Sequence, residues 1–167
     1  MTDTIAFIGF ISFVILLRLT ELIIARSNEK WMRRNGAVEY GQAHYPFIVL
    51  LHSLFFVSLI IEYNVKESTA FFPLLAVIYL ILAALKFWVI SSLGKFWNTK
   101  ILRIPSAILI NKGPYRFVKH PNYIIVVSEL LVIPLTFQLY YTAAIFTLLN
   151  AIMLFVRIRE ENRVLGY

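Results

Sequence analysis

Residues 119–138 read KHPNYIIVVSELLVIPLTFQ, a short polar start followed by an almost unbroken apolar run. A helix that spans a bilayer needs about 20 predominantly apolar residues, and this stretch approaches that length. Pro121 falls where a first helical turn tolerates proline, whereas Pro134 is expected to kink the helix or end it early. The stretch therefore predicts a membrane helix over 121–138 that begins at a polar surface.

Four further apolar runs, at 5–24, 46–63, 70–92 and 142–158, have comparable lengths. The 167 residues are 60% hydrophobic and 15% charged, with a mean hydropathy of +0.77, whereas soluble domains carry about 25% charged residues. We expect an all-α fold, with one integral membrane domain over residues 1–167 and five transmembrane helices, the last two forming a tight hairpin. The absence of cysteine excludes a disulfide framework, a thiolate metal site and a cysteine nucleophile, and no metal is expected.

Lysine and arginine are distributed unevenly among the connecting segments. Thirteen of the sixteen basic residues fall on one side of a five-helix arrangement: Arg26, Lys30, Arg33, Arg34, Lys95, Lys100, Arg103, Lys112, Arg116, Lys119, Arg157, Arg159 and Arg163. Basic segments stay in the cytoplasm, so this pattern predicts an N-terminus outside the cell and a C-terminus inside it. Positive-inside asymmetry and anionic lipid headgroups account for the net charge of +7 without a nucleic-acid partner.

Ionisable residues interrupt three of the apolar runs: Arg18, Glu21, Lys86 and Glu129. Charges inside a membrane cost several kcal/mol and usually face a bundle interior or a cavity. Arg18 and Glu21 are three residues apart, share a helix face and are expected to pair. Two interpretations stay open: the charges neutralise one another and fix helix packing, or they line a ligand pathway. Glu129 points away from His120 at 100° per residue, and Lys86 is expected to reach toward the headgroups.

His120 precedes the predicted helix start at Pro121, and Tyr123 follows one turn later. The unpaired N–H groups of a first helical turn favour an anionic group nearby. His120 is therefore a candidate helix cap, hydrogen-bond donor or base, against the alternative of a headgroup-level histidine without a special role. With Arg116 and Lys119 adjacent, a binding site is the favoured interpretation.

The C-terminal segment places Arg157, Glu160 and Glu161 on one helix face. They form either a solvated face of ion pairs or an acidic pair that faces a cationic ligand. The predicted hairpin returns this segment to the membrane face that holds His120. An anion-friendly helix start beside two carboxylates suits a zwitterionic ligand that carries an extra positive charge.

The stretch from Gly113 to Tyr123, followed by an apolar hairpin and Arg157 to Glu161, resembles the isoprenylcysteine carboxyl methyltransferase family. The resemblance is strongest over residues 94–163, and phosphatidylethanolamine methyltransferases look similar over the same stretch. Residues 18–46 look like short bacterial members of the family. No Gly-rich turn of the Rossmann type is present, which argues against a soluble-type methyltransferase domain.

The resemblance implies an enzyme of the bacterial plasma membrane that binds S-adenosyl-L-methionine at its cytoplasmic end and methylates a lipophilic acceptor entering from the bilayer. By motif position, it implies cofactor binding by His120, Pro121, Tyr123, Glu160, Glu161, Tyr115 and Arg116. Glu161 and His120 are the expected catalytic residues. Arg18, Glu21 and Trp97 are expected to contact the acceptor.

The acceptor itself stays open at this stage, with a lipid carboxylate and a lipid hydroxyl or enol as the candidates for O-methylation. Isoprenylcysteine fits poorly in a bacterium, where prenylated CaaX proteins would be lacking. The alternative functions are phospholipid N-methylation and a non-enzymatic membrane transporter or scaffold. A transporter usually shows internal repeats, and none is recognisable in this sequence.

Overall fold

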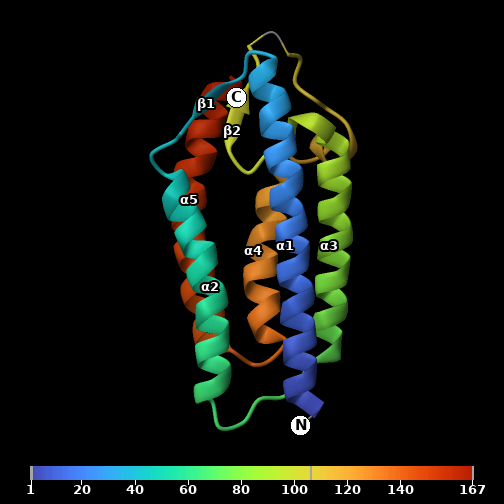
Figure 1. The fold of residues 1–167 in the computed structure, drawn as a ribbon, viewed down its shortest axis with the longest axis vertical. Coiled ribbons are helices and arrows are strands. Elements are labelled where there is room, and N and C mark those ends of the chain that lie inside the picture. Colours follow the sequence, from blue (N-terminus) through green and yellow to red (C-terminus); the bar gives the residue numbers. More distant parts are fainter. Residues whose placement is uncertain (1, 106, 167) are drawn as a thin grey trace.

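The computed structural model describes residues 2–105 and 107–166. These residues form an all-helical bundle with a small two-stranded sheet at one end (Figure 1). The helices are α1 Thr2–Arg34, α2 Tyr45–Val65, α3 Pro73–Leu93, α4 Pro121–Leu135 and α5 Tyr140–Leu165. Short 3-10 turns, η1 Gly94–Phe96 and η2 Gly113–Arg116, lie in the segment between α3 and α4. The predicted fold class is confirmed.

Helix α1 is longer than predicted, because residues 25–34 continue the helix where the sequence suggested a loop. Its 33 residues extend roughly 50 Å at 1.5 Å per residue, well beyond the ~30 Å hydrocarbon core of a bilayer. An ion pair between Glu29 and Arg33 of 2.8 Å, four residues apart, supports the additional turns. The basic end of α1 therefore extends beyond the apolar span as part of the same continuous helix.

Helix α4 is the shortest of the five and packs against both α3 and α5. Among the described residues, the four other helices are long and apolar enough to cross a membrane. The 15 residues of α4 extend roughly 22 Å, short of a full crossing. The helix ends one residue after Pro134, as predicted.

The end of α2 holds the turn between α4 and α5. The Glu62 carboxylate accepts hydrogen bonds from the backbone N–H groups of Tyr141, at 3.1 Å, and Thr142, at 2.7 Å. The Lys66 ammonium donates to the Gln138 carbonyl at 2.6 Å. These bonds satisfy free N–H groups at the start of α5 and fix the predicted hairpin against α2.

Aromatic side chains close the bundle at the end that holds the N-terminus. The Phe7 and Tyr63 rings stack at 3.8 Å between centroids and so join the start of α1 to the end of α2. The surrounding buried cluster includes Phe55, Tyr79, Phe137 and Phe146. A second, smaller apolar cluster joins Ala25, Val89, Trp97 and Ile125 toward the opposite end.

The sheet pairs β1 Val38–Tyr40 with β2 Ile101–Arg103 in antiparallel register, with Glu39 opposite Leu102. It lies beside the C-terminal end of α5, at the end of the bundle opposite the N-terminus (Figure 1). These two strands were not predicted from the sequence. They bring the segment after α1 against the long segment between α3 and α4.

Candidate active site

The start of α4 and the last turns of α5 meet in a group of five polar side chains, here called the helix-start cluster: His120, Tyr123, Arg157, Glu161 and Asn162. The Tyr123 hydroxyl donates a hydrogen bond to the Glu161 carboxylate. The His120 ring stacks on the Tyr123 ring at 5.3 Å, and its Nε2 lies 2.8 Å from the Asn162 side-chain oxygen. The predicted meeting of His120, Tyr123 and Glu161 is therefore present.

His120 occupies the N-cap position of α4, but its side chain makes no capping hydrogen bond. The amide oxygen of Asn162 only accepts, so Nε2 is assigned as the protonated nitrogen and Nδ1 faces Glu161 at 3.9 Å. Of the three roles considered for His120, the structure thus excludes capping by the side chain. Pro121 is buried in the first turn of α4, where proline is favoured.

Arg157 is the central member that the sequence analysis did not assign to the site. Its Nε donates to the Tyr123 hydroxyl at 2.7 Å, and its Nη2 donates to the Thr99 carbonyl at 2.5 Å. The side chain is buried, so these bonds operate away from bulk water. The available signal was its position four residues before Glu161, which places both side chains on one helix face.

The adjacent glutamates face different surroundings. Glu161 lies in the helix-start cluster, whereas Glu160 pairs with Arg163 at 2.5 Å. Glu160 also lines a separate hollow that His44 borders. The geometry therefore favours Glu161 as the member of the pair that meets a ligand.

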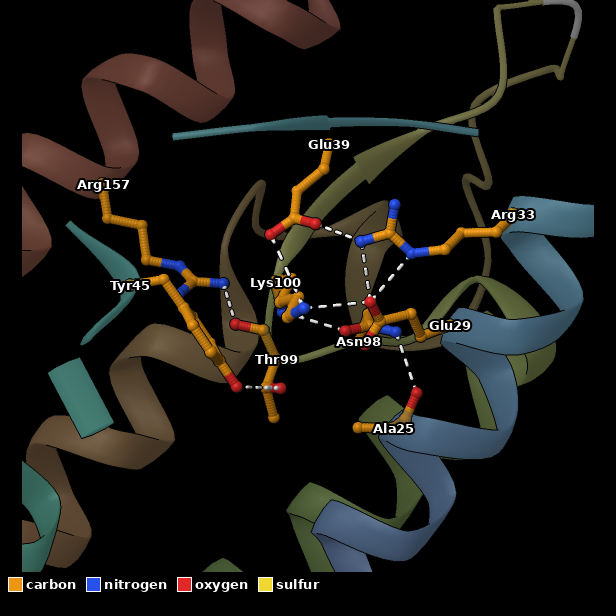
Figure 2. A network of polar contacts seen from close by, with 9 residues as sticks. All are labelled: Ala25, Glu29, Arg33, Glu39, Tyr45, Asn98, Thr99, Lys100 and Arg157. Carbon is orange, nitrogen blue, oxygen red and sulfur yellow. Dashed lines mark hydrogen bonds and ion pairs between the residues drawn. The ribbon is translucent and has the colours of Figure 1, made fainter. Parts of the chain in front are cut away.

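An ion-pair network covers this end of the bundle (Figure 2). Glu29 of α1 binds Arg33 at 2.8 Å and Lys100 at 2.9 Å, and Glu39 of β1 contacts Arg33 and lies 3.6 Å from Lys100. The hydrogen bond to Glu29 raises the pKa of the Lys100 ammonium above its usual value. The network fastens the segment around β2 to the end of α1.

Residues 98–100 connect this network to the helix-start cluster (Figure 2). The Asn98 side chain donates to the Ala25 carbonyl at 3.0 Å, and the Tyr45 hydroxyl lies 3.2 Å from Thr99 Oγ1. The Thr99 carbonyl accepts a hydrogen bond from the guanidinium of Arg157. One short segment thereby joins α1, α2 and α5 and orients Arg157.

A cavity of about 600 Å³ extends from this segment into the bundle. That volume lies within the ~300–1,000 Å³ typical of small-molecule sites. Its polar end is lined by Trp97, Tyr115, His120, Tyr123, Arg157 and Glu161. Arg116, in contrast, is exposed on η2 and does not line the cavity.

Three residues that line the cavity contain buried polar atoms without a hydrogen-bond partner among the described residues. These atoms are Trp97 Nε1, Asn122 Oδ1 and Asn150 Nδ2. Trp97 and Asn150 are 3% and 2% exposed. Buried polar groups in proteins are nearly always paired, so unpaired atoms along one cavity indicate a ligand site.

The four charges inside the apolar helices form a second cluster, here called the charge layer: Arg18, Glu21, Lys86 and Glu129. Arg18 lies 2.9 Å from Glu21 and 2.6 Å from Glu129. Lys86 lies 2.7 Å from Glu129 and 3.3 Å from Glu21. The predicted pairing of Arg18 with Glu21 is confirmed, and the layer joins α1, α3 and α4.

The prediction that Lys86 reaches toward the headgroups is wrong. Its side chain is 3% exposed and points into the bundle, because two carboxylates there compensate its charge. Arg18, Glu21 and Lys86 also line the cavity. The charges can therefore fix the packing of the helices and line a ligand pathway at the same time.

The fold and the site define an integral membrane helical bundle with a long cavity that ends at a His-Pro-x-Tyr helix start and a C-terminal glutamate. Residues 74–166 match the model of the isoprenylcysteine carboxyl methyltransferase (ICMT) family. The chain belongs to this family, and membership implies a membrane methyltransferase.

Two bacterial relatives align with nearly the whole chain. The chain is 43% identical over 157 residues to the uncharacterized protein YpbQ of Bacillus subtilis, covering 93% of this chain and 94% of the relative. It is 29% identical over 159 residues to an uncharacterized protein of Haemophilus influenzae, covering 92% and 91%. No solved structure matches the chain.

Proposed function

We propose that the protein transfers a methyl group from S-adenosyl-L-methionine to an oxygen of a lipophilic acceptor that reaches the cavity from the bilayer. One observation carries the proposal: the same cavity has the helix-start cluster at one end and apolar side chains of two long membrane helices along its side. Such a space lets a donor that binds from water meet an acceptor that dissolves in lipid.

The polar end fits the charges of the cofactor. S-adenosyl-L-methionine carries an ammonium, a carboxylate and a positively charged sulfur, and when bound it supplies an activated methyl group. Glu161 offers an anion and Arg157 a cation at this end. Trp97 Nε1 offers a donor and Asn122 Oδ1 an acceptor, and neither atom has a partner within residues 2–105 and 107–166. A site of both signs with spare hydrogen-bonding atoms suits a ligand of both signs.

The protein's own residues orient and shield the reaction. Arg157 is held by the Thr99 carbonyl and in turn fixes the Tyr123 hydroxyl, whose proton points to Glu161. A carboxylate acceptor is already ionised at neutral pH and needs only alignment. A hydroxyl or enol acceptor must lose a proton, and the Glu161 carboxylate and His120 are the adjacent groups that can take it.

The acceptor enters between α1 and α2. Leu19 and Leu22 of α1 and Val49 of α2 line the cavity, and each is also between 39% and 50% exposed on the outside of the bundle. At the opposite end, the Phe7 and Tyr63 rings stack and join the two helices. An entrance bordered by these half-exposed apolar side chains admits a lipid tail and disfavours ions.

The test is transfer of label from methyl-labelled S-adenosyl-L-methionine to a crude bacterial lipid extract, followed by partition between water and organic solvent. We expect label in the organic phase, bound to oxygen. Label only in water-soluble products would contradict a lipid acceptor. Label on phosphatidylethanolamine nitrogen would instead establish a phospholipid N-methyltransferase.

The orientation of the site is proposed from the basic residues and has its own test. The chain has no cysteine, so single cysteines at Asn35, Asn64 and Asn111 report unambiguously. All three positions are exposed. In intact cells, a membrane-impermeant thiol reagent should label Asn64→Cys only, and Asn35→Cys and Asn111→Cys only after lysis. Labelling of Asn111→Cys from outside would overturn a cytoplasmic site.

A further inference from the structure

The cavity reaches beyond the helix-start cluster to a second polar region. Arg18, Glu21, His52, Lys86 and Asn150 line this deeper part. Glu129, which holds Arg18 and Lys86, lies six residues after Tyr123 on α4, or about 9 Å deeper along the helix axis. A ligand that fills the cavity therefore meets polar groups at two depths.

The charged side chains of this deeper region already form ion pairs with one another. Two cations and two carboxylates pair with one another, so the charge layer offers no net charge to a ligand. The groups left for a ligand are uncharged. Asn150 Nδ2 is a buried donor without a partner among the described residues. His52 Nδ1 lies 2.9 Å from the Ile48 carbonyl, which only accepts, so the ring donates there and its Nε2 can accept.

A plain alkyl tail would leave the Asn150 donor unsatisfied in an apolar environment, which is unfavourable. An ionised group would bring an uncompensated charge to the level of the charge layer, which is also unfavourable. A neutral oxygen satisfies the donor without adding charge.

The Ser58 hydroxyl of α2 lies 2.8 Å from the Thr142 hydroxyl of α5. One turn further along both helices, the Phe55 and Phe146 rings are 5.6 Å apart. The two helices therefore run antiparallel, and one more turn brings His52 and Asn150 to the same level. A hydroxyl, which both donates and accepts, can bind the two side chains together.

We propose that Asn150 and His52 form a subsite for an uncharged oxygen, a hydroxyl or carbonyl, in the acceptor of the proposed methyl transfer. The acceptor then carries two polar groups, one at the helix-start cluster and one about 9 Å deeper. This proposal rests on the proposed function for the identity of the ligand as acceptor. The subsite itself is a property of the cavity and can be tested by binding alone.

The probes are hexadecanoic acid and a series of hydroxyhexadecanoic acids in which the hydroxyl moves along the chain. Their dissociation constants are measured by calorimetry on the full chain in lipid nanodiscs, with and without S-adenosylhomocysteine. We expect a narrow range of hydroxyl positions to bind at least ~10-fold more tightly than hexadecanoic acid. Equal binding of all positions in the wild-type protein would overturn the subsite.

The variant Asn150→Leu should abolish the higher affinity that the hydroxyl confers and leave the affinity for hexadecanoic acid unchanged. It removes an unpaired polar group, so the protein should fold at least as well as the wild type. Thr147→Val is the matched control, because Thr147 Oγ1 is also buried without a partner among the described residues but does not line the cavity.

Thr147→Val should still bind the favoured hydroxyhexadecanoic acid more tightly than hexadecanoic acid, to the same degree as the wild type. Loss of this difference in Thr147→Val would contradict the proposal. Its survival in Asn150→Leu would contradict the proposal as well. Failure of S-adenosylhomocysteine to bind would count against the proposed function alone, because the hydroxyl gain is measured without it as well.

Discussion

The helix-start cluster and the charge layer both join distant helices through buried polar groups, yet they use those groups differently. In the charge layer, each carboxylate meets two cations, and the four charges neutralise one another. In the helix-start cluster, the side chains hold one another in place, but Trp97 and Asn122 beside them have polar atoms without a partner in the described part of the chain. Buried polar groups that pair fully with one another hold the membrane fold together. Buried polar groups without such a partner are available to bind a ligand.

The largest effect is expected from removing the more buried of the two anions in the charge layer. Glu129→Gln takes away the carboxylate that lies 2.6 Å from Arg18 and 2.7 Å from Lys86. It leaves the two cations with Glu21 alone, at 2.9 and 3.3 Å. Loss of one partner in a buried ion pair costs about 3–5 kcal/mol, so the variant should be strongly destabilised in denaturant unfolding in detergent.

Glu21→Gln is the matched control for this experiment, because Glu21 contacts the same two cations at longer distances and its side chain is 16% exposed, against 2% for Glu129. It should lose clearly less stability than Glu129→Gln. Equal losses in the two variants, or a Glu129→Gln protein as stable as the wild type, would show that Glu129 is not the main anion that holds the layer together.

In the helix-start cluster, Arg157→Ala should affect ligand binding first and stability second. The variant loses the donors to Tyr123 and Thr99, and hydrogen bonds to charged groups contribute about 1.5–3 kcal/mol each. We expect at least ~10-fold weaker binding of S-adenosylhomocysteine, a free-energy difference of about 1.4 kcal/mol. Arg159→Ala, on the exposed face of the same helix, should bind like the wild type. Equal binding by both variants would remove Arg157 from the site.

The ion-pair network above the site should contribute least. Lys100→Gln removes two partly exposed ion pairs, and such pairs contribute about 0–1 kcal/mol. Because folding raises the pKa of Lys100 above its usual 10.5, this contribution is complete at lower pH and is lost as pH rises through the folded-state value. The stability difference between wild type and Lys100→Gln should therefore be constant from pH 7 to 9 and shrink above about pH 10.5. A difference that grows with rising pH would contradict the assigned pairing.

Local patterns accounted for the helices and for part of the site. Apolar runs predicted the five helices, and a three-residue spacing predicted the pairing of Arg18 with Glu21. The hairpin topology correctly brought Tyr123 and Glu161 to one end. These features depend on spacing along a helix or on neighbouring helices.

The features that the sequence analysis missed depend on long-range contacts. Lys86 meets Glu129 across 43 residues, and nothing near Lys86 in the sequence indicates a partner. The strands β1 and β2 have three residues each, too few for a recognisable alternation. Arg157 could be placed on the correct helix face, but its contact with Thr99 depends on how the segment between α3 and α4 folds back.

The most direct test of the account is calorimetric titration of S-adenosylhomocysteine into the purified full chain, wild type, Glu161→Gln and Glu160→Gln. The two variants remove adjacent charges, of which only Glu161 lines the cavity. We expect binding by the wild type, at least ~10-fold weaker binding by Glu161→Gln, or about 1.4 kcal/mol, and unchanged binding by Glu160→Gln. His120→Ala should weaken binding to a similar degree. No binding by the folded wild type, or equal affinities for the wild type and Glu161→Gln, would contradict the assignment of the helix-start cluster as the cofactor site.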